Sequence, residues 1–175
     1  MDYSTTSLAS DADLFMTDHD EPTDLKSSAD SKGQFAPHGE FTLRSDGEIL
    51  CYEATGPFNL ESMQALRITR IKAYERWQPT RKFAAVVHWH NSALMSPEAF
   101  HAYRDGYIQF IQNTQAEAVV AWAADADVEG MYLMVQKFAE VFALTRTNFR
   151  FFTDIAPAQA WVRESLDQLK SGPPS

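Results

Sequence analysis

Residues 40–170 alternate strand-like and helix-like stretches without a break, and this alternation constrains the fold more than any other feature. Two stretches, Phe83–Val87 and Ala118–Ala123, are apolar at every position, which is typical of strands covered on both faces. Around them, apolar residues recur at three- and four-residue steps, as on one side of an amphipathic helix. A chain of 175 residues with 45% hydrophobic residues can bury one core of this kind. We therefore expect a single α/β domain.

The domain is expected to open with a hairpin. Asp46-Gly47 lies between two alternating runs, Phe41–Arg44 and Ile49–Tyr52, and this dipeptide favours a tight two-residue turn. Strands and helices then follow one another up to the last strand, Phe149–Phe152, and a closing helix. Because crossovers between neighbouring strands are right-handed, the later strands should be parallel. The sequence predicts one mixed sheet of about five strands, an antiparallel hairpin followed by parallel strands, with helices packed on it.

Polar residues mark where the helices should begin. Asn59 precedes the first helix, which should end before Pro79, and Ser96 precedes the second, followed by proline and an acid. Asp127 is the expected N-cap of the third helix. Asp125 and Asp127 could instead act as a general base or bind a cation.

The negative charge is concentrated at the start of the chain. Residues 1–30 hold eight acidic residues against one lysine, a charge of −7 within the total of −9. Residues 1–38 show no helical or strand period, so we expect a disordered acidic tail there and a domain over residues 39–171. The apolar island Leu14-Phe15-Met16 could dock into a partner groove or simply be solvated.

Basic residues cluster in and after the first predicted helix. A run of this kind is usually a solvated helix face, and the alternative is that it docks an acidic surface, the tail of this protein among them. The residues are Arg67, Arg70, Lys72, Arg76, Arg81 and Lys82.

Charge and composition exclude several classes of function. The body of the chain is nearly neutral, whereas nucleic-acid binding depends on Lys and Arg that neutralise phosphates. Cys51 is the single cysteine, so an internal disulfide is impossible. We find no signal peptide, no stretch long enough to span a membrane and no phosphate or dinucleotide loop, so we expect a cytoplasmic protein without a cofactor.

Two histidines lie at the end of the first buried strand. His88 and His90 are two residues apart, so their side chains should point to the same face, at the end of the sheet where open α/β folds bind ligands. A zinc site would need further ligands, for which His101, Asp125 and Asp127 are the candidates. The simpler interpretation is a histidine pair that lines a loop or binds backbone carbonyls, and we predict no metal.

Three aromatic residues could line a cleft between the sheet and the helices. Tyr103 and Tyr107 lie on the apolar side of the second predicted helix, and Trp122 lies in the second buried strand. Large aromatic residues in such positions usually pack in the core. A cleft for a small apolar, lipid-like ligand is the alternative.

The order of elements resembles the SpoIIAA-like branch of the STAS domains over about residues 40–170. The resemblance rests on Gly56–Glu61 entering the first helix, on Val86-Val87 entering a loop that caps the second, and on Phe152–Trp161 near the end. It implies a small cytoplasmic α/β domain used for protein interaction or regulation, and some relatives are likened to lipid-binding domains.

Anti-sigma-factor antagonists of that family carry an Asp-Ser-Ser-Gly-like phosphoacceptor just before the second helix. Here the matching stretch, Asn91–Pro97, lacks that string, and Ser92 and Ser96 are its only hydroxyls. A phosphate at a helix N-terminus would be electrostatically favourable. The candidate loop for a ligand, partner or phosphate therefore comprises His88, His90, Asn91, Ser92 and Ser96.

From the sequence we predict a non-enzymatic, cytoplasmic, STAS-like regulatory or protein-interaction domain. Its partner is an unknown protein or a second copy of the chain. Two alternatives stay open: a binder of a small apolar ligand, and a metal-dependent enzyme that uses His88 and His90.

Overall fold

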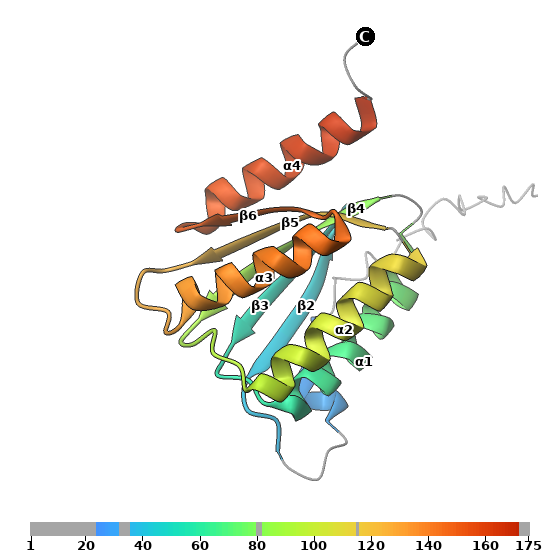
Figure 1. The fold of residues 1–175 in the computed structure, drawn as a ribbon. Coiled ribbons are helices and arrows are strands. Elements are labelled where there is room, and N and C mark those ends of the chain that lie inside the picture. Colours follow the sequence, from blue (N-terminus) through green and yellow to red (C-terminus); the bar gives the residue numbers. More distant parts are fainter. Residues whose placement is uncertain (1–23, 32–35, 80–81, 115, 172–175) are drawn as a thin grey trace, which may run out of the picture.

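The computed structural model describes residues 24–31, 36–79, 82–114 and 116–171. In these residues one six-stranded sheet carries helices on both faces (Figure 1). The strands are β1 (Leu25–Lys26), β2 (Glu40–Asp46), β3 (Ile49–Thr55), β4 (Phe83–His90), β5 (Glu117–Ala124) and β6 (Asn148–Phe152). The helices are the 3-10 turn η1 (Ser27–Asp30), α1 (Leu60–Trp77), α2 (Pro97–Thr114), α3 (Met131–Thr145) and α4 (Ile155–Ser171).

The strands lie in chain order, from β1 at one edge to β6 at the other. β1, β2 and β3 are antiparallel, and β3, β4, β5 and β6 are parallel. The mixed α/β sheet predicted from the sequence is confirmed, including the hairpin at Gly47, whose φ is +59°. The sixth strand is β1, which lies before the predicted start of the domain.

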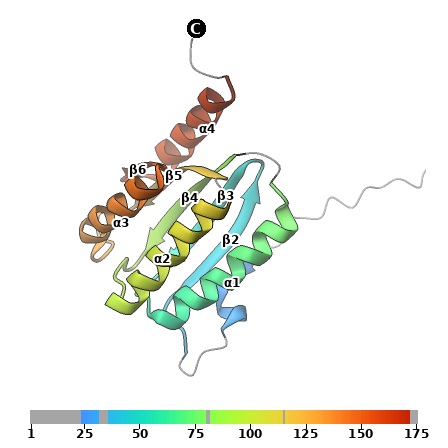
Figure 2. The same ribbon diagram turned by 45° about the vertical axis from the view of Figure 1, so that its right-hand side comes forward.

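The two faces of the sheet are covered unequally. Alternate residues of the strands, such as Tyr52, Val87 and Trp122, pack against α1, α2 and α3 on one face. The strand residues between them, such as Cys51 and Val86, point to the other face and pack against α4. Figure 1 shows α4 on the opposite side of the sheet from the other helices, and Figure 2 shows α1 and α2 side by side across the front of the sheet.

Two of the three predicted helix caps are confirmed. The side-chain oxygen of Asn59 accepts a hydrogen bond from the backbone N–H of Ser62 at 3.1 Å, and Ser96 accepts one from Ala99 at 3.2 Å. The prediction for Asp127 is wrong, because α3 begins only at Met131, after Gly130, and has no side-chain cap. The chain before α3 is instead held by a bridge between Glu129 and the loop that follows β4.

The predicted disorder of residues 1–38 is wrong for residues 24–31. Leu25–Lys26 pairs with β2, and the hydroxyl of Ser27 accepts a hydrogen bond from the N–H of Phe41 at 2.8 Å. This segment holds few apolar residues, and its position depends on contacts with the rest of the domain that no local pattern reveals. Residues 1–23, which include Leu14-Phe15-Met16, and residues 32–35 lie outside the described residues. Ala36 and His38 are described, and both form hydrogen bonds with the side chain of Asn59.

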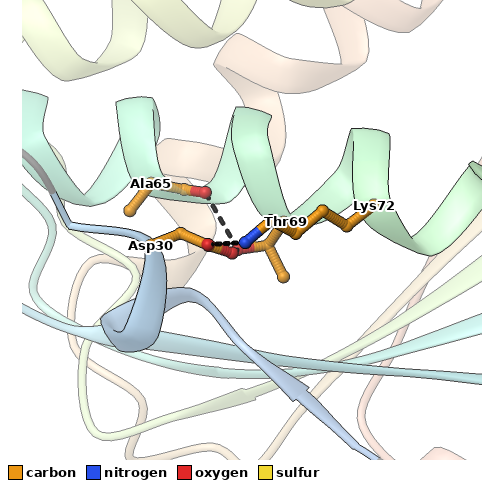
Figure 3. A network of polar contacts seen from close by, with 4 residues as sticks. All are labelled: Asp30, Ala65, Thr69 and Lys72. Atoms are coloured by element: carbon orange, nitrogen blue, oxygen red, sulfur yellow. Dashed lines mark hydrogen bonds and ion pairs between the residues drawn. The ribbon is translucent and has the colours of Figure 1, made fainter.

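Asp30 attaches this segment to α1. Its side chain is 7% exposed, accepts a hydrogen bond from the Thr69 hydroxyl at 2.7 Å and pairs with Lys72 (Figure 3). Thr69 also donates to the Ala65 carbonyl of its own helix. One acid of the predicted tail thus does contact the basic helix, as the docking alternative proposed.

None of the helices among the described residues is long and apolar enough to cross a membrane.

We expect Asp30→Ala to lower the free energy of unfolding by about 1–3 kcal/mol, because it removes the acceptor of a buried hydrogen bond. Urea denaturation followed by circular dichroism measures this change. Asp24→Ala, at an exposed position of the same segment, is the control and should change stability little. Equal effects of the two variants would contradict the role assigned to Asp30.

Candidate functional site

The face of the sheet under α4 changes from apolar to polar along the strands. On β3, Ile49 and Cys51 are buried, whereas Glu53 further along the same face is partly exposed. On β4 the same change occurs between Val86, which is buried, and the histidines His88 and His90. The polar halves of the two strands lie beside each other because Glu53 pairs in register with His88.

Glu53, His88 and His90 form one cluster on this polar half. The Oε2 atom of Glu53 lies 2.7 Å from Nε2 of His90 and 3.3 Å from Nδ1 of His88. The imidazole ring centres are 4.2 Å apart. The side chains of Glu53, His88 and His90 are 45%, 23% and 37% exposed. Solvent therefore reaches all three residues, and one carboxylate oxygen faces two ring nitrogens.

The prediction that His88 and His90 share a face is confirmed, but the candidates named for the zinc alternative are not the residues that join them. Among the described residues, His101, Asp125 and Asp127 do not form part of the cluster, whereas Glu53 does. Glu53 was missed because its proximity depends on the pairing of β3 with β4. Its signal in the sequence is an acid on the same side of the strand as Ile49 and Cys51, where an apolar residue would be expected.

The rest of the candidate loop does not line this face. Ser92 is buried, with 3% of its surface exposed, and its hydroxyl accepts a hydrogen bond from the N–H of Leu94 at 3.2 Å. Asn91 takes a left-handed conformation with φ of 60°, and Ser96 caps α2. Phosphorylation of Ser92 would thus require the loop to open.

Tyr103, Tyr107 and Trp122 do lie together between the sheet and the helices. The rings of Tyr103 and Tyr107 are stacked, with their centres 5.6 Å apart. The ring centres of Tyr103 and Trp122 each lie 4.7 Å from that of Phe138. Tyr103 and Trp122 line a cavity of about 20 Å³. A water molecule needs roughly 10–15 Å³, so this space fits one water and no larger ligand.

Arg70 makes this cavity polar. Its guanidinium lies 5.5–6.0 Å from the ring centres of three tyrosines, Tyr52, Tyr103 and Tyr107. Its Nε is buried and finds no hydrogen-bond partner among the described residues. The interpretation of Arg70 as part of a solvated helix face is therefore wrong. Its guanidinium lies among tyrosine rings of β3 and α2, and cation–π attraction stabilises its charge there.

Glu117 is the second charged residue of this cavity. It is 5% exposed and accepts a hydrogen bond from the Tyr107 hydroxyl at 2.7 Å. Burial raises the pKa of Glu117, while the charge of Arg70 and the Tyr107 hydrogen bond oppose that rise. Burial also raises the pKa of Tyr103 to about 12.

Comparison with known proteins gives one informative match. No protein-family model matches the chain, and no curated protein matches it. A solved structure from Shewanella loihica is similar, with a TM-score of 0.50, 16% identity, and coverage of 74% of this chain and 98% of that chain. That structure is described as an uncharacterized protein from the DUF3478 family with a SpoIIAA-like fold.

The chain has a SpoIIAA-like fold. At 16% identity the likeness shows the fold alone, and it confirms the architecture expected from the resemblance to STAS domains. Within this SpoIIAA-like fold the histidine cluster lies at the carboxyl ends of parallel strands, the position where open α/β sheets commonly bind ligands.

We expect Glu117 to make stability depend on pH. Because its folded pKa is raised, the folded state holds the proton more tightly, so stability falls as pH rises from the ordinary value of 4.5 through the folded pKa. Glu117→Gln keeps an acceptor for Tyr107 and removes this titration. As the pH rises from 5 to 7.5, the free energy of unfolding of wild type should therefore fall relative to that of the variant. A difference that stays constant over that range would contradict the assignment.

Proposed function

We propose that this chain is a non-enzymatic regulatory domain of the cytoplasm that works by binding another protein. The SpoIIAA-like fold is compatible with this role, and a groove with exposed leucines carries the proposal. The groove lies where the C-terminal parts of α2, α3 and α4 meet the starts of β5 and β6, and its volume is about 1520 Å³.

The walls of the groove combine apolar residues with charges of both signs. Leu144 of α3 and Leu169 of α4 are 72% and 50% exposed, although both are large and apolar. Ile108 and Ile111 of α2 add further apolar surface. Lys82 and Glu164 are among the charged residues around them. Exposed leucines concentrated in a concave surface with a polar rim are typical of a protein-binding site.

The size of the groove favours a protein segment over a small molecule. Pockets for small ligands usually measure about 300–1,000 Å³ and enclose most of the ligand. A groove of about 1520 Å³ between three helices is larger and suits an amphipathic helix whose apolar side covers the leucines. We therefore infer that the partner presents such a helix.

A different protein is a better partner than a second copy paired through β6. β6 pairs with β5 on one side only, so its outer edge is open within the described sheet. In a symmetric antiparallel pairing centred on β6, Arg150 would lie opposite Arg150 of the second copy. Like charges directly opposite each other destabilise a pair of strands.

The alternative function, binding of a small apolar ligand between the sheet and the helices, has less support than the leucine-lined groove gives to protein binding. The space between Tyr103 and Trp122 is about 20 Å³, and Arg70 and Glu117 line it. A lipid-like chain would need far more volume and no buried charges.

We expect the double variant Leu144→Glu/Leu169→Glu to bind its partner at least about tenfold more weakly, because two leucines lose their apolar contacts. Purification of the tagged protein from its host, with wild type and variants in parallel, identifies the partner as the protein lost with the double variant. Calorimetry with the purified partner then gives the affinity. Tyr132→Glu is the control, since Tyr132 is also on α3 and 67% exposed but does not line the groove. A partner that binds the double variant as tightly as wild type would contradict the proposed groove.

A further inference from the structure

We propose that Glu53, His88 and His90 bind one divalent transition-metal ion of the zinc type. The site is separate from the leucine groove, because it lies at the carboxyl ends of β3 and β4 on the face of the sheet under α4. The groove lies at the opposite, amino-terminal ends of the strands β5 and β6.

The donor set selects the kind of ion. Two imidazole nitrogens and one carboxylate oxygen are the three protein ligands that zinc often takes when a fourth position stays open. Imidazole suits zinc, copper, nickel and iron, whereas calcium and magnesium prefer oxygen ligands only. With two nitrogen donors out of three, we infer an ion of the first group.

The distances suit a shared ion. The three candidate ligand atoms all lie within 4.8 Å of one another, and Glu53 Oε2 lies 2.7 and 3.3 Å from the two nitrogens. Bonds of about 2.0–2.1 Å to a tetrahedral zinc ion place neighbouring donors roughly 3.3 Å apart. The distance from Glu53 Oε2 to His88 lies at this value, and the distance to His90 is shorter. The parallel register of β3 and β4 places Glu53 and His88 side by side.

The surroundings leave the cluster free to accept an ion and a further ligand. Thr42 and Ala123 are the residues beside Glu53 and His88 in the neighbouring strands, and both are small. In the described part of the chain, Glu53 forms ion pairs with the two histidines and with no lysine or arginine. The partial exposure of the cluster lets an ion enter from solvent, and a water molecule or a group of another molecule can take the fourth position.

The contacts of His88 and His90 with Glu53 compete with a bound ion, because both use the same ring nitrogens. A neutral imidazole that donates a hydrogen bond to Glu53 carries its proton on the nitrogen that faces the carboxylate. The ion needs the lone pair of that same nitrogen, so the proton must move to the other ring nitrogen when the ion binds. Metal binding therefore replaces the hydrogen bond between His90 and Glu53 and the contact between His88 and Glu53, and it joins β3 to β4 through the ion.

The test is zinc titration of the full chain after treatment with a chelator. Competition with a chromophoric chelator should show one equivalent of Zn²⁺ bound, and His88→Ala and His90→Ala should each weaken binding at least tenfold. Glu53→Gln keeps the shape of the side chain but removes its charge, and it should also weaken binding. His101→Ala is the control, because His101 is exposed on α2 and outside the cluster. Circular dichroism confirms that each variant is folded.

Two readouts separate this site from loose binding by other carboxylates of this acidic chain. Zn²⁺ should raise the midpoint of thermal unfolding of wild type and of His101→Ala, but not of His90→Ala. Co²⁺ in place of Zn²⁺ should give visible absorption bands that the His88→Ala variant lacks. Stoichiometric zinc binding that survives both histidine substitutions, or the lack of stoichiometric binding by wild type, would overturn the proposal. Neither result bears on partner binding in the leucine groove.

Discussion

The packing of α4 on the sheet is the constraint on which the rest of the structure depends. Ala158 and Val162 are fully buried against the sheet, in one apolar cluster with Cys51 of β3, Val86 of β4 and Ala121 of β5. Ion pairs from Arg163 to Asp46 and from Lys170 to Glu48 connect the same helix to the hairpin. Exposed ion pairs contribute little, so apolar burial holds the helix in place. The residues of β3 and β4 in this apolar cluster end at Cys51 and Val86, and Glu53, His88 and His90 follow them on the partly exposed half of the same face.

The order of the elements could be predicted because each one has a local cause. Residues Phe83–Val87 are apolar at every position since both faces of β4 are covered, and Asn59 and Ser96 stand at helix starts because their side chains satisfy free N–H groups. The segment Leu25–Asp30 has no such local cause. It is held by contacts between positions far apart in the chain, such as Asp30 with Thr69, which composition does not reveal.

The candidate site could be predicted only in part for the same reason. The two-residue period of a strand places His88 and His90 on one face, but it says nothing about which strand lies alongside. Glu53 joins them through the parallel pairing of β3 with β4, and Arg70 turns inward because tyrosines of other elements receive its charge. For the aromatic residues, the sequence favours core packing, with a ligand cleft as the alternative, but it does not show that Phe138 packs against both Tyr103 and Trp122.

Thiol labelling tests most directly whether α4 divides this face into a covered and an open half. Cys51 lies under α4 and is 9% exposed, and burial raises the pKa of its thiol. Thr55 lies on the same face of the same strand, in the open half. We predict that Cys51 reacts with a thiol reagent only when the protein unfolds, whereas the cysteine introduced in Cys51→Ala/Thr55→Cys reacts in the native protein. Equal reactivity of the two positions in the native state would contradict it.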